Sequence, residues 1–147
     1  MHLFNLLAAL PLPAHLLPVQ QELERVGVQI FYATPPRAGV YGLYQPASKK
    51  LWVAPITEPL GILQRTFLHE AVHAAQACPS GVVKPLGVKT QLSPVVSRQI
   101  QFLLHSNYSH GQTAVEREAF EIQGRPDAVP LLLRVLQQRC RPQVQPR

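Results

Sequence analysis

The sequence has few charged residues and no long hydrophobic run, and each shortage excludes a class of protein. Charged residues make up only 15% of the 147 residues, whereas hydrophobic residues make up 46%. This composition is typical of a globular chain rather than a disordered one. No apolar stretch approaches the roughly 20 residues that cross a bilayer. We therefore expect a single domain over residues 1–147 with no membrane span, an irregular N-terminal segment at 1–18 and a flexible tail at 141–147.

Cysteine is also scarce, since Cys78 and Cys140 are the only two. Two cysteines do not make a disulfide framework in a chain of this length. They are either free thiols or one bridge that ties the C-terminal helix back to the core. The short apolar run at residues 3–10 has no Lys or Arg before it and no small-residue cleavage site after it, which favours a packed segment over a signal peptide. We therefore expect a cytoplasmic protein, with secretion as the alternative.

The chain is basic, with a formal net charge of +6 and a pI of about 9.8. A basic balance can indicate a nucleic-acid partner. Here the 14 Lys and Arg residues are scattered mostly singly, and no nucleic-acid motif accompanies them. A nucleic-acid partner is therefore not expected. A basic helical module would instead bind nucleic acid with a steep dependence on salt.

Local patterns predict an α+β fold in which a small antiparallel sheet packs on a central helix and further helices follow. The central helix is expected to begin at Thr57-Glu58-Pro59, which offers a hydroxyl cap, an acid and an early proline. Its apolar residues lie nearly all round, as in a helix buried in the middle of a protein. Asp127 is placed to cap the last helix. The expected helices cover residues 19–26, 57–77, 93–105, 113–123 and 127–139, and the expected strands cover 28–33, 39–44 and 50–54.

The central helix carries the sequence His69-Glu70-Ala71-Val72-His73, which is the pattern H-E-x-x-H. Residues four apart on a helix lie about 40° apart round the axis, so both imidazoles can bind one metal ion from the same side. Glu70 lies about 100° from His69, where it can reach a water beside the metal without being a ligand. The pattern predicts a Zn²⁺ site with Glu70 as the general base.

A catalytic zinc ion normally has three protein ligands, and the motif supplies two. The longer pattern H-E-x-x-H-x-x-G-x-x-H is excluded, because Gln76 and Pro79 stand where it needs glycine and histidine. The only aspartate is Asp127, which lies late in the chain at a helix start. Glutamates therefore remain, and the expected helix over 113–123 contains three of them, Glu116, Glu118 and Glu121.

H-E-x-x-H followed by a helix with E-x-x-A resembles the gluzincin branch of the zinc metallopeptidases, which share a zincin-like fold. The resemblance implies His69 and His73 as zinc ligands, Glu116 as the third ligand, and Ala119 as the small residue that lets the two helices approach. Glu118 points about 200° away from Glu116 on a helix, so it is the second choice for the third ligand. Glu121 is the third choice.

The chain departs from this family at Phe120, where many gluzincins have an aspartate that hydrogen-bonds a ligand histidine. Such partners normally orient the imidazole. Gln76, on the same helical face as the two histidines, or a backbone carbonyl could replace the aspartate. Tyr108 and His110, just before the Glu116 helix, are the candidates for stabilising the oxyanion of the transition state.

The resemblance implies a metallopeptidase that hydrolyses peptide bonds of a peptide or protein substrate, with Glu70 assisting the attack of zinc-activated water. By analogy, the strand at 51–54 would present an edge to an extended peptide. The alternative is a catalytically silent zinc-binding domain that acts as a binding or regulatory module, which the departure at Phe120 motivates.

Overall fold

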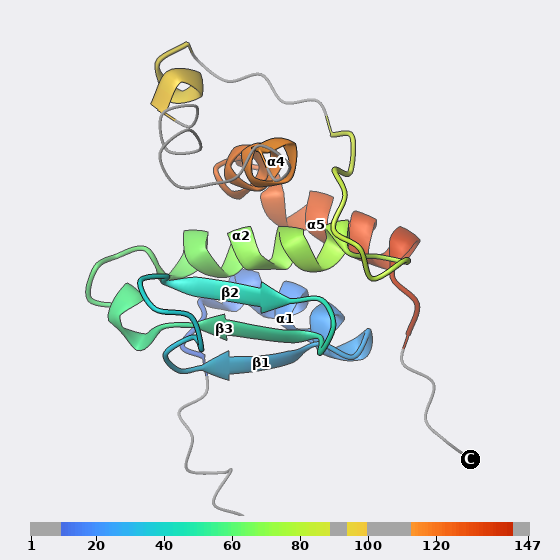
Figure 1. Ribbon diagram of the computed structural model, residues 1–147, viewed down its shortest axis with the longest axis horizontal. Helices are drawn as coiled ribbons and strands as arrows, with labels where there is room; N and C mark the ends of the chain where they lie inside the picture. Colours follow the sequence, from blue (N-terminus) through green and yellow to red (C-terminus); the bar gives the residue numbers. More distant parts are fainter. Residues whose placement is uncertain (1–9, 89–93, 100–112, 143–147) are drawn as a thin grey trace, which may run out of the picture.

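A computed structural model describes residues 10–88, 94–99 and 113–142. It has the α+β architecture that the sequence predicts (Figure 1). Residues 94–99 are also helical. In chain order the other elements are η2 (Ala14–Leu16), α1 (Leu17–Arg25), β1 (Gln29–Tyr32), β2 (Gly42–Gln45), β3 (Lys50–Val53), η3 (Pro55–Thr57), α2 (Leu63–Gln76), α4 (Thr113–Gln123) and α5 (Ala128–Arg139).

The sheet is mixed, so the prediction of an antiparallel sheet is wrong. Its strand order is β1-β3-β2. β2 and β3 form the expected antiparallel hairpin, with Tyr44 opposite Leu51. β1 runs parallel to β3, with Ile30 opposite Leu51, because the chain crosses over between β1 and β2 and returns on the far side of β3. β3 is therefore the central strand, and β2 is an edge strand.

Helix α2 lies between the sheet and the C-terminal helices (Figure 1). It contacts β2 and β3 on one side and α4 and α5 on the other, while α1 packs against β1 and α5. Of its 14 residues 11 are buried, including Phe67 and Val72. The prediction of a buried central helix is thus confirmed. None of the helices in the described part of the chain has the length and hydropathy of a transmembrane span.

The central helix begins later than the sequence pattern suggests. Thr57 ends η3, and its hydroxyl donates a hydrogen bond to the carbonyl of Ala54 at 2.6 Å. Gly61 then adopts a φ of 71°, a left-handed conformation that glycine tolerates and that interrupts a helix. α2 therefore starts at Leu63, and Thr57 does not cap it.

The last helix is tied to the end of α2 by a disulfide between Cys78 and Cys140. Of the two possibilities that the sequence leaves open, the bridge is the one found. Arg139 adds a hydrogen bond from its guanidinium to the carbonyl of Cys78, at 2.9 Å. Asp127 stands at the N-cap position of α5 but makes no capping hydrogen bond, because its carboxylate pairs with Arg125 at 2.7 Å.

The edge strand β2 lies unusually close to α2, and Gly42 makes this approach possible. A Cβ atom at position 42 would lie 2.7 Å from Cγ2 of Thr66 and 2.9 Å from Cγ of Glu70. Real Cβ atoms almost never come so near to other heavy atoms. The absence of a side chain at Gly42 therefore sets the distance between β2 and the motif helix.

Replacing Gly42 with alanine should lower the free energy of unfolding by about 1–3 kcal/mol, because the added methyl group forces β2 away from α2. Urea denaturation followed by circular dichroism measures this change. Gly124→Ala is the matched control, since a Cβ there would lie 3.9 Å from the Phe120 carbonyl oxygen, an ordinary van der Waals contact. Equal stability of the two variants would contradict this account of Gly42.

Candidate metal centre

The histidines of the motif lie on one buried face of α2. His69 and His73 are 9% and 8% exposed, and Glu70 between them is 7% exposed. The two rings lie with their centroids 4.8 Å apart and nearly perpendicular. Unpartnered polar groups in such a setting would cost several kcal/mol, so the positions of their partners determine what this face can do.

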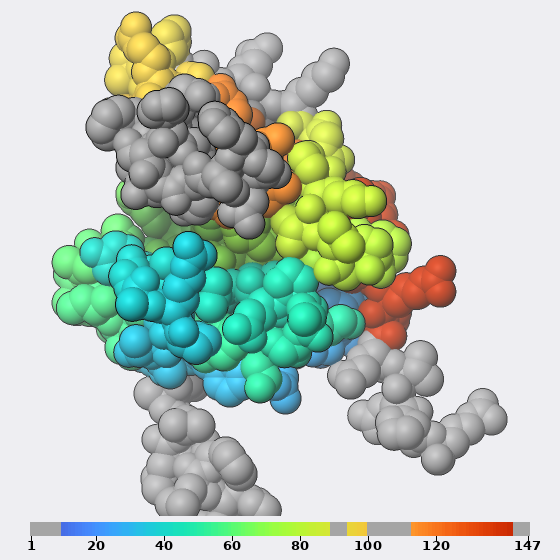
Figure 2. All heavy atoms as spheres, viewed as in Figure 1, coloured from blue at the N-terminus to red at the C-terminus, as the bar shows by residue number. Residues whose placement is uncertain are grey.

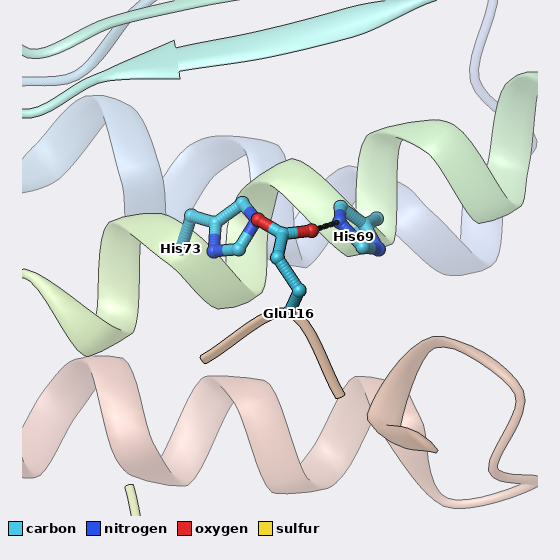
Figure 3. Close-up of side chains that lie close together, drawn as sticks. All are labelled: His69, His73 and Glu116. Carbon is cyan, nitrogen blue, oxygen red and sulfur yellow. Dashed lines mark hydrogen bonds and ion pairs between the residues drawn. The ribbon is translucent and has the colours of Figure 1, made fainter. Parts of the chain in front are cut away.

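Helix α4 supplies the third member of the cluster, Glu116. Its carboxylate lies between the two rings, with Oε2 at 3.0 Å from Nε2 of His69 and Oε1 at 2.8 Å from Nε2 of His73 (Figure 3). Ala119, one turn further along α4, is fully buried and leaves room for the two helices to approach. The predicted grouping of His69, His73 and Glu116 is therefore present in the structure.

Gln76 holds the second ring nitrogen of His73. The amide nitrogen of Gln76 donates hydrogen bonds to the carbonyl of Val115 and the carboxylate of Glu118. The amide oxygen is therefore the atom that faces Nδ1 of His73, at 2.7 Å. Because this oxygen can only accept, Nδ1 carries the proton and donates it. The expectation that Gln76 could replace the missing aspartate is met at this histidine.

Gln123 orients the imidazole of His69 as Gln76 orients that of His73, and the sequence analysis missed it. Its amide oxygen lies 2.7 Å from Nδ1 of His69, which donates a hydrogen bond to it. Phe120 packs against the same imidazole, with ring centroids 4.6 Å apart. The signal for Gln123 was available, because a residue seven positions after Glu116 lies on the same face of a helix.

The other two glutamates of α4 are not part of the cluster. Glu118 is buried and accepts hydrogen bonds from the backbone N–H groups of Leu86, Gly87 and Val88, at 2.6, 2.9 and 3.3 Å. It thereby fastens the segment after α2 to α4. Glu121 pairs with Arg117 at 3.1 Å. Neither carboxylate belongs to the group that could hold a metal ion.

Glu116 and His73 each shift the pKa of the other. Burial raises the pKa of the Glu116 carboxyl, but hydrogen bonds from His69 and His73 outweigh burial and lower this pKa to about 2. Burial lowers the pKa of His73, but the hydrogen bond to Glu116 and the charges of Glu70 and Glu116 raise it to about 9. The carboxylate and the imidazolium thus stabilise each other.

Glu70 has a different environment from Glu116. Burial raises the pKa of the Glu70 carboxyl, and the opposing effects of the two histidines and of a hydrogen bond from the backbone of Tyr44 are smaller. Tyr44 belongs to β2, so the close approach at Gly42 also supplies this hydrogen bond. A carboxyl group with a raised pKa is suited to accept a proton near neutral pH.

The cluster opens into a cleft of about 790 Å³. One wall is the motif face of α2, and the other is the edge strand β2 with the segment 37–41 before it. In Figure 2 the darker green atoms of α2 are set back behind the cyan atoms of this wall, and the yellow-green segment 77–88 lies at one end. Glu70, Glu116 and both histidines line the cleft.

The donor set fits a zinc ion. His69, His73 and Glu116 offer two imidazole nitrogens and a carboxylate oxygen, all within 4.8 Å of one another. Since the Nδ1 atoms are held by glutamine oxygens, it is the two Nε2 atoms that face the carboxylate and can bind a metal in place of their protons. Imidazole nitrogen and carboxylate oxygen are the usual ligands of a catalytic zinc ion.

Tyr108 and His110, the candidates for stabilising the oxyanion, lie outside the described residues.

Comparison of the chain with protein-family models, with curated proteins and with solved structures found no match.

With a metal chelator present, His73 should titrate well above its usual pKa of 6.5, toward 9. A raised pKa favours the protonated folded state, so the contribution of His73 to stability is complete below pH 6.5 and is lost as the pH rises through 9. In Glu116→Gln the charge is lost while burial remains, so the pKa of His73 falls. Two-dimensional NMR of the imidazoles measures both values.

The control for this titration is Glu121→Gln, on the same helix but paired with Arg117. It should leave the His73 titration unchanged. A wild-type His73 that titrates at or below its usual pKa would contradict the ion pair with Glu116.

Proposed function

We propose that this protein is a zinc-dependent metallopeptidase. The observation that carries the proposal is the position of the Glu116 carboxylate between Nε2 of His69 and Nε2 of His73. These two histidines and the glutamate would hold the ion and leave it accessible to water or substrate. Zinc bound there would act as a Lewis acid that lowers the pKa of water toward neutrality and polarises a carbonyl group.

In this mechanism Glu70 moves the proton. Its carboxylate takes a proton from the attacking water as the new carbon–oxygen bond forms. It then gives the proton to the amine nitrogen as the carbon–nitrogen bond of the peptide breaks. Two features support this role: Glu70 lines the same cleft as the metal-binding group, and burial raises the pKa of its carboxyl.

The substrate would lie along β2, not along the strand at 51–54, which pairs with neighbours on both sides. The carbonyl of Tyr41 accepts a hydrogen bond from Ala54, so by the alternation of an antiparallel ladder the backbone groups of Gly42 and Tyr44 face away from β3. The N–H of Tyr44 already donates a hydrogen bond to Glu70, so the Gly42 backbone groups and the Tyr44 carbonyl are the ones left at the edge of the cleft. An extended peptide can add its own backbone to such an edge.

The partners of the two histidines favour an active enzyme over a silent zinc-binding module. The departure at Phe120 motivated the silent alternative, since it removes an aspartate that orients a histidine. Gln123 and Gln76 perform this task for His69 and His73, each at 2.7 Å. The cleft therefore retains an oriented ligand set and a buried base.

The disulfide bears on where this enzyme works. A bridge between Cys78 and Cys140 is typical of proteins from oxidising compartments and rare in the cytosol. We therefore propose an oxidising compartment in place of the cytoplasm that the sequence analysis expected. Retention of the bridge in protein purified without reductant, measured by mass spectrometry, supports this assignment.

The purified protein should bind about one zinc ion per chain and cleave peptides in its presence. Glu70→Gln should keep the zinc and lose most of the activity, because it removes the base and not a ligand. Elemental analysis and a fluorogenic peptide assay measure the two properties. Zinc-loaded wild type that cleaves no peptide, or Glu70→Gln with full activity, would contradict the proposal.

Zinc affinity should fall strongly when a ligand is removed and moderately when a hydrogen-bond partner of a ligand is removed. His69→Ala and Glu116→Ala remove ligands and should abolish stoichiometric binding. Gln123→Ala removes only the support of His69 and should weaken binding by roughly 10- to 100-fold. Gln137→Ala, an exposed glutamine of α5, is the control and should match the wild type. Competition with a chromogenic chelator measures all four, and circular dichroism shows that each variant is folded.

A further inference from the structure

The cleft carries positive charge that the proposed mechanism does not use. Among the described residues that line it, the charged side chains outside the metal-binding group and Glu70 are Arg37 and Arg65. Both are exposed. Within the described part of the chain, neither guanidinium has a hydrogen bond or an ion pair. Two cations with no partner among the described residues therefore line the space where a substrate would lie.

Both arginines lie toward the N-terminal end of α2. Arg65 is in the first turn of that helix. Tyr44 lies beside Glu70 and Gly42 lies beside Thr66, so β2 runs in the same direction as α2 (Figure 1). The segment before β2, which contains Arg37, therefore approaches the N-terminal end of α2.

Arg65 is not placed where a cation would stabilise its own helix. The N-terminus of a helix carries a partial positive charge, so acidic residues are favoured in the first turn. α2 has no acidic residue there. Arg65 and the N-terminal end of α2 thus both favour a negatively charged group of a bound ligand. Arg65 lines the cleft, so such a group would lie in the cleft.

The opposite end of the cleft is apolar. Val83 and Val115 line it there. Their position follows from Gln76 at the end of α2, whose backbone carbonyl accepts a hydrogen bond from Lys84 and whose side chain donates one to Val115. The metal-binding group lies between the two ends, so a peptide in the cleft meets arginines on one side and valines on the other.

We propose that the cleft selects extended peptides with an acidic side chain on one side of the cleaved bond and an apolar side chain on the other. This inference rests on the proposed function. Arg65 is four residues before His69, about 6 Å along the helix axis, and an extended peptide advances about 3.3 Å per residue. The acidic residue therefore lies roughly one to three positions from the cleaved bond.

The test uses binding as well as cleavage. Zinc-loaded Glu70→Gln is titrated into fluorescein-labelled peptides that differ only in Glu, Ala or Lys at each position around an apolar residue. Fluorescence anisotropy should show the best Glu peptide binding about tenfold more tightly than its Lys counterpart, with less difference at high salt. Adding Arg37→Glu and Arg65→Glu should reverse the preference, whereas Arg134→Glu, an exposed residue of α5, should preserve it.

Cleavage of the same peptides by the zinc-loaded wild type separates the possible failures. Binding or cleavage without preference for acidic peptides would overturn the substrate class and leave the peptidase intact. Binding that prefers acidic peptides, without cleavage, would overturn the peptidase and keep the charge selectivity. Neither binding nor cleavage of any peptide would overturn both.

Discussion

The contacts of the Glu116 carboxylate with Nε2 of His69 and Nε2 of His73 hold three largely buried ionisable side chains together. A buried carboxylate or imidazolium without a partner costs several kcal/mol. Here the carboxylate lies 2.8 and 3.0 Å from the two imidazoles, so the cost is offset only while α4 stays against α2. The small side chain of Ala119 permits this contact, and the buried Ile122 adds apolar surface on the same helix.

The contact between α2 and α4 also brings together further polar groups behind the histidines. Gln76 joins His73 to Glu118, and Glu118 in turn holds the backbone of residues 86–88. A change in the loop after α2 can therefore reach His73 through the buried side chains of Glu118 and Gln76. On the opposite wall, Gly42 lets the edge strand approach the motif helix closely. The two walls of the cleft are thus held in place by separate contacts, a hydrogen-bond network on one side and close packing at Gly42 on the other.

The parts of the site that depend on helical periodicity could be predicted from the sequence. His69 and His73 share a face because they are four residues apart, and Glu116 followed from its resemblance to a known helix pattern. Gln123 obeys the same periodicity but was missed, since a glutamine gives no chemical signal until its partner is known. The parallel pairing of β1 depends on a crossover that local patterns do not specify. The close approach at Gly42 likewise depends on how two distant segments meet.

In the proposed function, two histidines and one glutamate hold the zinc ion with no sulfur ligand. X-ray absorption at the zinc edge of the zinc-loaded protein tests it most directly. Only nitrogen and oxygen neighbours are expected, at about 2.0–2.2 Å, with the outer-shell scattering of two imidazole rings. Cys78 and Cys140 are joined in a disulfide and should contribute nothing. A sulfur neighbour at about 2.3 Å, or a spectrum with one imidazole or none, would contradict the account.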